Sequence, residues 1–250
     1  MQIIISPAKK MRIDNDDQAP AGEPRFLKDT EILLSALKQM QYDELKNLWQ
    51  CNDEIAALNY KRLQSMRLQD NLTPAVLAYD GIQYQYMAPR VFENVQLDYV
   101  AEHLNILSGF YGILKAMDGV VPYRLEMQAK LQAGGYKNLY DFWGNRLYLE
   151  LTQNDKSILN LASKEYSKAV EKYLTPEVEY VTCVFGMRQE GKIKVKATEA
   201  KMARGEMVRF MAENNIENPV DIKKFDRLGY TFRGDLSSET EYVFERKAIK

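Results

Sequence analysis

The polar residues of this chain that could bind a ligand or catalyse a reaction come directly after short apolar runs in the sequence. Ile3–Ile5 is followed by Ser6–Lys9, in which a serine and a lysine stand three positions apart. Penicillin-binding enzymes use such an S-x-x-K pair for acylation, but they also need S-D-N and K-T-G strings, which this sequence lacks. Lys9, with Lys10 beside it, is better explained as a cation at the mouth of an anion-binding cleft. The alternative is ordinary solvated surface charge.

Side chains able to act as an acid, a base or a nucleophile follow other apolar runs. The carboxylate of Asp80 or Glu165 could act as a general base if burial or a partner raised its pKa towards the working pH. The full set of catalytic candidates is Ser6, Asp80, Glu165 and Tyr166. Since no known catalytic spacing joins them, catalysis stays uncertain and a binding function is favoured.

Two further segments could contact phosphate. Ser108 and Gly109 follow an apolar run and begin a G-x-x-G string whose backbone amides could approach a phosphate, although a plain turn into a helix over residues 113–117 is an equally good explanation. Arg124 is suited to a bidentate anion contact. Its alternative role is an internal salt bridge to Glu126 or Asp118.

The most basic part of the chain is residues 192–209, where six basic and two acidic residues give a local charge of +4 in a chain of net charge −1. A helix expected from Ala197 would bring its basic residues onto one arc, together with Gly205. A glycine inside a helix costs about 1 kcal/mol relative to alanine, so close approach of a phosphate or of another backbone is expected there. The alternative is a solvated basic face. The phosphate-binding candidates in this region are Lys201, Arg204, Gly205 and Arg209. Lys164, which follows the apolar run 158–161, is a further candidate.

Composition excludes several classes of protein. His103 is the single histidine, and Cys51 and Cys183 are the only cysteines, so neither a metal site nor a disulfide framework is expected. Cys183 lies in an apolar run and is expected to be buried and inert. The longest apolar runs have five or six residues, whereas a membrane span needs about 20. With no recognisable signal peptide, we expect a cytoplasmic protein without a cofactor and without membrane contact.

The elements that must position these residues follow from hydrophobic patterning. Short apolar runs that alternate with helical stretches predict buried, mostly parallel strands, and ligands bind beyond the carboxyl ends of such strands. The polar loops behind the runs are therefore expected to converge on one cleft, or else to be ordinary turns. The expected strands are 3–5, 75–78, 104–107 and 158–161, a hairpin of 178–185 with 192–197, and 230–233 and 241–246.

These elements predict a single α/β (mixed α+β) domain over residues 1–250, with a central, mostly parallel sheet flanked by helices. Two or three helices are expected between residues 25 and 70, where leucines recur at helical spacing, and one long helix is expected from 197 to about 214.

Seven blocks in this order resemble the YaaA peroxide-stress protein family of bacteria, and the similarity spans essentially the whole chain. They are ISPAK (5–9), LSGFYGIL (107–114), PYRLEM (122–127), FWG (142–144), NLASKEY (160–166), ARGEMVRF (203–210) and FDRLGY (225–230).

The resemblance implies an unusual α/β fold and a cytosolic protein that protects against hydrogen peroxide, in association with limited intracellular iron and DNA repair. It also implies binding to duplex and branched DNA, without sequence preference, through a basic cleft and a helix-hairpin-helix element. The cleft residues carried over are Lys9, Arg124, Lys201, Arg204 and Arg209. The hairpin is expected at 45–66, where Lys61 and Arg62 would contact DNA, although the glycine-rich turn of that element is missing.

Two departures from the family pattern add positive charge. Lys10 stands where family members usually have threonine, and Arg233 stands where many have asparagine. Both suit a polyanion, but they put in doubt any shared hydrogen-bonding role at these positions.

Three functions remain open at this stage. The first is a non-catalytic DNA-binding protein of the peroxide response, whose affinity would fall steeply with salt. The second is an enzyme that acts on a nucleotide or damaged base in the same cleft, for which a small phosphorylated ligand would be the partner. The third is a scaffold whose basic face meets an acidic protein. A deep pocket with converging side chains would favour the enzyme, and a shallow basic groove would favour DNA binding.

Overall fold

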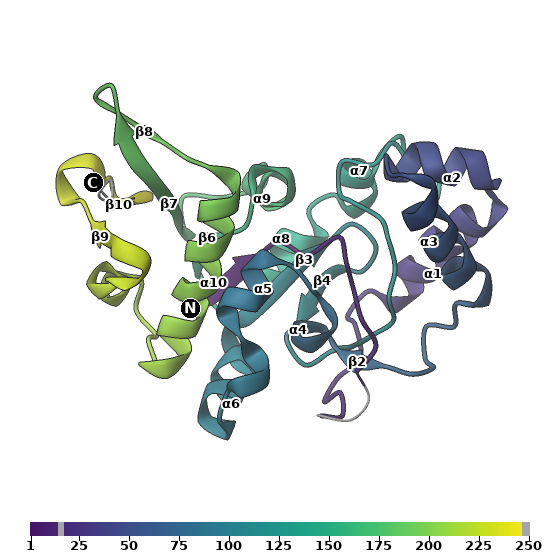
Figure 1. Ribbon diagram of the computed structural model, residues 1–250, viewed down its shortest axis with the longest axis horizontal. Helices are drawn as coiled ribbons and strands as arrows, with labels where there is room; N and C mark the ends of the chain where they lie inside the picture. Colours follow the sequence, from purple (N-terminus) through teal and green to yellow (C-terminus); the bar gives the residue numbers. More distant parts are fainter. Residues whose placement is uncertain (15–17, 247–250) are drawn as a thin grey trace.

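A computed structural model describes residues 1–14 and 18–246 (Figure 1). Within these residues one sheet has the strand order β4-β3-β1-β6-β7-β10-β9, and β8 pairs with β7. The neighbours β3, β1, β6, β7 and β10 run parallel, and the outer pairs β3–β4, β9–β10 and β7–β8 are antiparallel. The expected mixed α/β fold with a mostly parallel central sheet is therefore confirmed. The strands are β1 (Gln2–Ile5), β3 (Leu104–Ser108), β4 (Gly112–Lys115), β6 (Ser157–Leu161), β7 (Glu179–Gln189), β8 (Lys192–Lys194), β9 (Tyr230–Phe232) and β10 (Glu241–Arg246), with a separate small pair, β2 (Thr73–Pro74) and β5 (Gly119–Val120).

Strand β1 lies in the middle of the parallel part of the sheet. Ile3, Ile4 and Ile5 are completely buried, because both faces of β1 are covered and both edges are paired. A continuous β-branched run is typical of a strand in this position. Beyond Ile5 the chain leaves the sheet next to the end of β6, which brings Ser6 towards Ser163.

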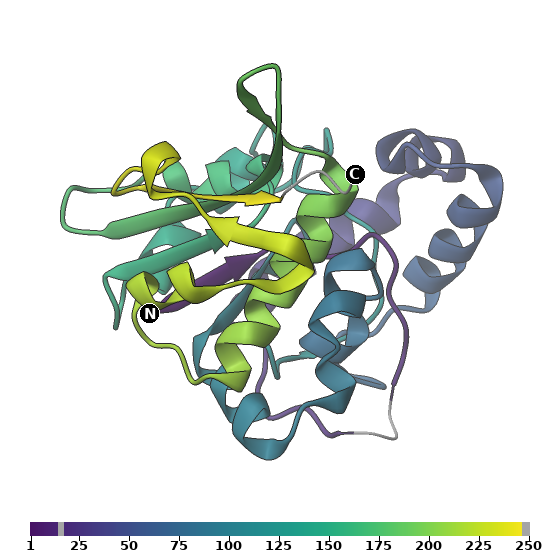
Figure 2. The same ribbon diagram turned by 60° about the vertical axis from the view of Figure 1, so that its left-hand side comes forward.

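Helices cover both faces of the sheet. Figure 2 shows α10 in front of the strands with α5 and α6 beside it, whereas α8 and α9 lie behind the sheet. The N-terminal helices α1, α2 and α3 form a group at one end of the molecule (Figure 1). The helices are α1 (Leu27–Gln39), α2 (Tyr42–Trp49), α3 (Asp53–Ser65), α4 (Ala75–Ala78), α5 (Ile82–Met87), α6 (Asn94–His103), α7 (Leu139–Trp143), α8 (Arg146–Leu151), α9 (Lys164–Glu171) and α10 (Ala197–Glu213), with short 3₁₀ turns at Pro89–Val91, Pro219–Lys224, Arg227–Gly229 and Gly234–Leu236.

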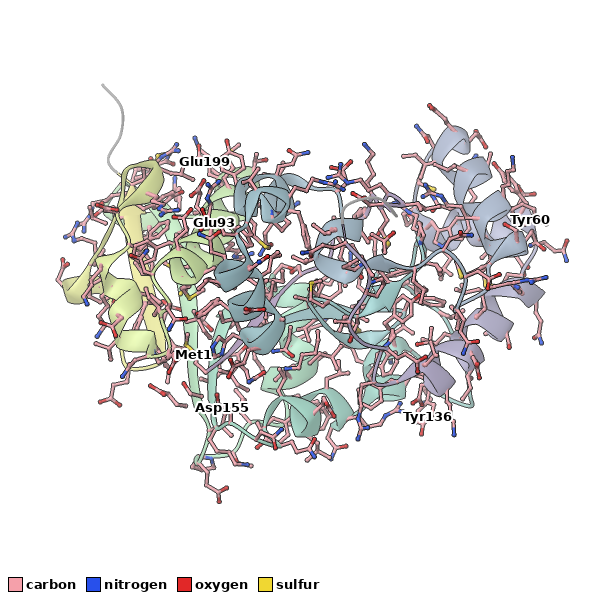
Figure 3. All side chains as sticks on the ribbon, turned by 90° about the horizontal axis from the view of Figure 1, so that it is seen from below. Met1, Tyr60, Glu93, Tyr136, Asp155 and Glu199 are labelled. Carbon is pink, nitrogen blue, oxygen red and sulfur yellow. The ribbon has the colours of Figure 1, made fainter. Side chains whose placement is uncertain are left out.

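The N-terminal helical group shares its core with the sheet. Leu33 and Leu37 of α1 and Leu45 and Trp49 of α2 are buried in the same hydrophobic cluster as the isoleucines of β1. Figure 3 shows Tyr60 of α3 and Glu199 of α10 near opposite ends of the molecule. The helices expected between residues 25 and 70 are thus present, far from α10.

Two of the sequence predictions are wrong. Ala75–Ala78 was expected as a strand and is the helix α4, all of whose residues are buried. A short apolar run does not reveal its period, because every face of such a helix is apolar. Residues 113–117 were expected as a helix, but Gly112 has φ +76° and turns the chain back, so that Ile113 pairs with Leu107 in a β3–β4 hairpin.

The expected C-terminal elements are present, but the hairpin has other bounds, because β7 continues to Gln189 and β8 ends at Lys194. β7 and β8 form the expected hairpin, in which Met187 pairs with Lys194, and the long helix from Ala197 ends at Glu213. β9 and β10 stand within a residue of their expected bounds. The described residues contain no helix that is both long and apolar enough to cross a membrane.

Candidate functional site

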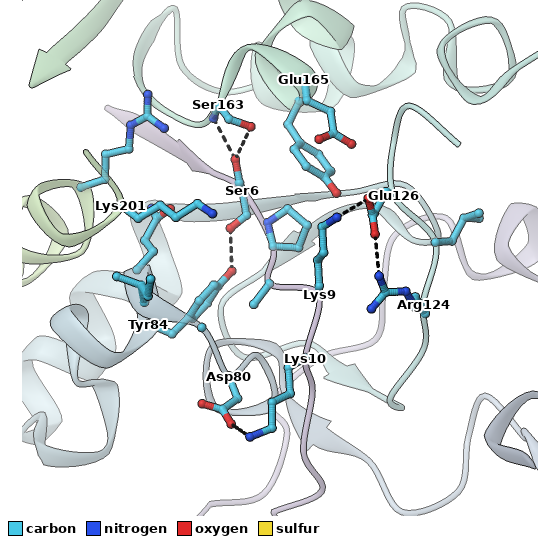
Figure 4. Close-up of a pocket in the computed structure, with 18 of the residues that line it drawn as sticks. Ser6, Lys9, Lys10, Asp80, Tyr84, Arg124, Glu126, Ser163, Glu165 and Lys201 are labelled. Atoms are coloured by element: carbon cyan, nitrogen blue, oxygen red, sulfur yellow. Dashed lines mark hydrogen bonds and ion pairs between the residues drawn. The ribbon is translucent and has the colours of Figure 1, made fainter. Parts of the chain in front are cut away.

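A pocket of about 380 Å³ opens at the carboxyl ends of β1 and β6 (Figure 4). Its walls come from the loops behind these strands, the start of α5, the 123–126 segment and one face of α10. Of the residues that the sequence singled out, it brings together Ser6, Lys9, Lys10, Asp80, Arg124, Glu165, Tyr166, Lys201 and Arg204. The other lining residues are Pro7, Ala8, Gly81, Ile82, Gln83, Tyr84, Tyr123, Leu125, Glu126 and Ser163.

Ser6 ties the floor of the pocket together. The backbone N–H of Ser163 donates to Ser6 Oγ at 2.8 Å, and the Ser6 hydroxyl donates to Ser163 Oγ at 3.1 Å. The Tyr84 hydroxyl donates to the Ser6 carbonyl oxygen at 2.9 Å. These bonds join β1, β6 and α5, so two of the strand-end loops converge as the sequence predicted.

Acidic side chains pair with most of the cations on the loop side of the pocket. Lys9 Nζ lies 2.8 Å from Glu126 Oε2, and Arg124 Nη2 lies 3.2 Å from Glu126 Oε1. Lys10 Nζ lies 2.8 Å from Asp80 Oδ2, and this contact holds the pKa of Asp80 below its usual value. The internal salt bridge considered for Arg124 is therefore present.

The two cations of α10 that line the pocket have no such partners. Lys201 and Arg204 line the pocket without an ion pair within the described residues. Arg204 Nε is buried without a hydrogen-bond acceptor, and burial lowers the pKa of its guanidinium group. Two more buried donors of the pocket, Gln83 Nε2 and Arg124 Nε, also lack an acceptor. Buried polar atoms are nearly always paired. Trp49 Nε1, Tyr230 OH and Arg246 Nε, which do not line the pocket, also lack a partner, so half of the unpaired buried donors of the described residues gather at the pocket.

Five basic and three acidic side chains line the pocket, so it carries two net positive charges when all are ionised. The third carboxylate, Glu165, accepts a hydrogen bond from the Gln128 N–H at 3.2 Å. Burial raises the pKa of Glu165, and the nearby charge of Glu126 acts in the same direction. The pocket therefore combines an excess of cations with a carboxyl group that is poorly stabilised in its charged form.

Ser108 and Gly109 lie behind the pocket instead of lining it. Ser108 Oγ accepts the N–H groups of Phe110 and Tyr111 at 3.1 and 2.9 Å, so these amides are not available to a phosphate. A Cβ on Gly109 would stand 2.6 Å from the Leu125 carbonyl oxygen. The glycine thus lets the 124–126 segment cross close above it, which positions the ion pairs of the pocket.

Gly205 approaches another backbone and not a ligand. A Cβ at this position would meet the Gln83 carbonyl oxygen at 2.1 Å and the Met87 nitrogen at 2.9 Å. The absence of a side chain therefore allows α10 and α5 to touch. Close helix contact holds Gln83 and Tyr84 at the pocket, two residues that sequence reasoning missed.

The remaining basic candidates are not among the residues that line the pocket. Lys164 pairs with Glu171, and Arg209 Nε lies 2.7 Å from Glu213 Oε1. Lys61 and Arg62 belong to α3, and they do not line the pocket. Three residues without a glycine join α2 to α3, and Gln50 among them takes the left-handed conformation with φ 46°.

Neither the single histidine nor the cysteines contribute to the pocket. His103 is buried and its Nδ1 lies 3.0 Å from the Met1 carbonyl oxygen. Cys183 is buried as expected, and burial raises the pKa of its thiol, which disfavours the reactive thiolate. Among the described residues, His, Cys, Asp and Glu form no group of three that could hold a metal ion.

The fold and the pocket define a mixed α/β protein with a donor-rich, net positive pocket at the end of a parallel sheet. The family model described as peroxide stress protein YaaA matches residues 1–236, and the chain belongs to this family. It is similar to a UPF0246 protein of Agathobacter rectalis, 59% identical over 99% of both chains. It is also similar to UPF0246 proteins of Desulfitobacterium hafniense, 57% identical over 98% of this chain and 97% of the relative, and of Pediococcus pentosaceus, 54% identical over 100% and 99%.

Proposed function

We propose that this peroxide-stress protein binds DNA without sequence preference and that a phosphate group enters the pocket beside Lys201 and Arg204. The observation that carries the proposal is the set of buried donors without acceptors, namely Gln83 Nε2, Arg124 Nε and Arg204 Nε. A phosphate offers several acceptor oxygens and a negative charge, and arginine binds it well. One such group beside α10 would satisfy Gln83 Nε2 and Arg204 Nε, which the protein itself leaves unpaired, and Arg124 Nε remains as a donor on the other side of the pocket.

Charges around the mouth of the pocket support a polyanionic partner. The side chains of Lys9 and Lys10 are 64% and 77% exposed, so they can contact further phosphates although each has a carboxylate partner. The net charge of the whole chain is −1, so attraction to DNA has to come from this local surface. As the family resemblance suggested, we further propose that the protein acts in the cytoplasm, where DNA binding helps to limit oxidative damage, and that it contributes to limiting intracellular iron.

Duplex binding across a salt series tests this proposal. We expect the affinity of the wild type to fall steeply with salt, because each neutralised phosphate releases counterions. The double variant Lys201→Gln/Arg204→Gln should bind at least tenfold more weakly and lower the slope of log affinity against log salt by about 2. Arg209→Gln, on the same helix but outside the pocket, is the matched control and should stay within about twofold of the wild type.

Duplex binding that is absent, independent of salt or unaffected by the double variant would contradict this proposal. Equal losses in the double variant and in Arg209→Gln would contradict the role of the pocket, since they would indicate diffuse electrostatics along α10.

A second candidate function is an enzyme acting on a nucleotide or damaged base. It is favoured by the pocket volume of about 380 Å³, which lies within the range of about 300–1,000 Å³ typical of small-molecule sites. All four catalytic candidates, Ser6, Asp80, Glu165 and Tyr166, line this volume. Chromatography of oxidised and unmodified nucleotides after incubation tests for turnover. Product that forms with the wild type and not with Glu165→Gln would support catalysis, and unchanged nucleotides would dismiss it.

A further inference from the structure

The two sides of the pocket differ in what they offer a ligand. Figure 4 shows Lys201 on one side and Glu165, Glu126 and Arg124 on the other, with Ser6 between them. On the α10 side the free groups are cations and N–H donors. On the opposite side the free groups are the Oε2 of Glu165 and the buried Nε of Arg124. A ligand that fits both sides has an anionic end and a hydrogen-bond-donating end.

The α10 side suits a phosphate. Lys201 and Arg204 stand three residues apart on one helix and therefore share a face. Gln83 is only 6% exposed, its Nε2 has no acceptor, and it lines the same pocket. A guanidinium, an ammonium and an amide thus lack acceptors together, and a phosphate has enough oxygens for all three.

The opposite side suits a group with N–H donors. Both Glu126 oxygens are taken, one by Arg124 and one by Lys9. Glu165 uses only Oε1, which accepts the Gln128 N–H, and its Oε2 has no partner within the described residues. A carboxylate oxygen accepts readily from the amino group of a nucleobase, as aspartate and glutamate do with cytosine.

Part of the pocket lining is apolar and aromatic. Pro7, Ile82 and Leu125 and the rings of Tyr123 and Tyr166 contribute to it. Aromatic and apolar side chains are the surfaces against which nucleobases stack. The volume, about 380 Å³, is at the lower end of the small-molecule range and suits one nucleotide better than a stretch of strand.

We infer that the pocket holds one whole nucleotide, with its phosphate against Lys201, Arg204 and Gln83 and the amino group of its base against Glu165. The inference rests on the proposed phosphate binding and adds the base and its orientation. The nucleotide is either free in solution or a unit of DNA displaced from the stack, as in proteins that flip a base into a pocket. Bases that carry an amino group, in adenine, guanine and cytosine, should be preferred over uracil and thymine.

Calorimetric titration with matched fragments tests the inference. We expect AMP, GMP and CMP to bind at least tenfold more tightly than ribose 5-phosphate, which lacks the base, and than the nucleosides, which lack the phosphate. Arg204→Gln should remove the advantage of a nucleotide over its nucleoside. Glu165→Gln should weaken AMP, GMP and CMP at least fivefold and leave ribose 5-phosphate within twofold of the wild type. Arg209→Gln, outside the pocket, should change none of these affinities.

The outcomes separate the two proposals. Equal affinity for ribose 5-phosphate and the nucleotides would overturn the base site and leave phosphate binding intact. Absence of binding to every phosphorylated compound and to DNA would overturn both. To distinguish the sources, a single-stranded oligonucleotide is compared with the same oligonucleotide carrying an abasic site. Weaker binding of the abasic strand, together with displacement of the intact strand by AMP, supports a displaced DNA nucleotide. Tight AMP binding with no difference between the strands supports a free nucleotide.

Discussion

Under the proposed function, the charge of Arg204 serves a ligand and not the fold. Its Nε is buried without an acceptor, and burial lowers the pKa of the guanidinium. A buried donor without a partner costs about 1–3 kcal/mol. We expect Arg204→Met, which keeps most of the apolar stem, to raise the free energy of unfolding by about 1 kcal/mol and to weaken phosphate binding. Urea denaturation without ligand measures the first effect.

Arg209→Met is the control for this prediction. Arg209 is paired with Glu213, so its replacement should lower the free energy of unfolding by at most about 0.5 kcal/mol. A loss of stability in Arg204→Met larger than that in the control would show that Arg204 holds the fold together.

The buried carboxyl group of Asp118 should make the stability of the protein depend on pH. Burial raises its pKa to about 6 from 3.8, although it accepts a hydrogen bond from the Lys115 N–H at 2.8 Å. A raised carboxyl pKa means that the folded state binds the proton more tightly, so this group's contribution is complete below pH 3.8 and is lost as pH rises through 6. Asp118→Asn should remove that loss and stabilise the protein at pH 7 by on the order of 2 kcal/mol.

Urea denaturation between pH 4 and pH 8 measures this effect. The curve of the wild type should fall relative to that of Asp118→Asn between about pH 4 and pH 6. Asp98→Asn, an exposed substitution on α6, should run parallel to the wild type. Parallel curves for Asp118→Asn and the wild type would contradict the prediction.

At the scale of elements, the contact between α10 and α5 depends on Gly205. Because a Cβ there would stand 2.1 Å from the Gln83 carbonyl oxygen, Gly205→Ala has to push the helices apart. Overpacking costs about 1–3 kcal/mol, and the better helix propensity of alanine returns only part of it. We expect a lower melting temperature and weaker phosphate binding, since Gln83 and Tyr84 move with α5. Thermal unfolding and calorimetry measure the two effects.

Gly234→Ala is the matched control. A Cβ at Gly234 would meet only the ring of Phe232 at 3.6 Å, an ordinary contact. Its melting temperature should stay within about 2 °C of the wild type. An equal change in melting temperature for both substitutions would mean that the contact between α10 and α5 does not require glycine at position 205.

Hydrophobic patterning correctly predicted the long amphipathic helix and the strand that consists of β-branched residues. The β-branched run of β1 and the long amphipathic α10 are where they were expected. Ala75–Ala78 could not be read correctly, because four buried residues of a one-turn helix look like a buried strand. After Gly112 a helix was expected where the structure has the strand β4, because these residues form a strand only through their pairing with β3.

For the site, the sequence indicated which cations line the pocket, but it did not indicate which of them form ion pairs. Lys9, Arg124 and Arg204 do line one pocket, as cations of the sequence motifs should. Their state depends on tertiary contacts: Glu126 forms ion pairs with the first two, and no carboxylate of the described residues forms one with the third. Gln83 carried no signal of its own, and the only hint was the unexplained glycine of α10.

At the scale of the whole molecule, one hydrophobic cluster runs through the sheet and the N-terminal helices. We therefore expect a single cooperative unfolding transition. Tryptophan emission, from Trp49 in α2 and Trp143 in α7, should change at the same temperature as far-ultraviolet circular dichroism. Leu33→Ala in α1 should lower both midpoints together, at a cost of about 2–5 kcal/mol, because Leu33 is fully buried.

Ile32→Ala is the neighbouring control, since Ile32 is 45% exposed and its substitution should cost much less. Two separate transitions, with tryptophan emission changing first, would mean that the N-terminal helices are an independent unit.

The central place of β1 has a consequence for synthesis on the ribosome. β1 is made long before its partners, which are Leu104–Ser108 and Ser157–Leu161. At an elongation rate of about 5–20 residues per second, the roughly 100 residues between β1 and β3 take about 5–20 seconds to make, and during this time Ile3–Ile5 has no strand beside it. The nascent chain therefore carries an unpaired, aggregation-prone strand until β3 has emerged, and one open edge of β1 until β6 has emerged. Ribosome-associated chaperones that bind short apolar segments of nascent chains should accordingly raise the yield of folded protein.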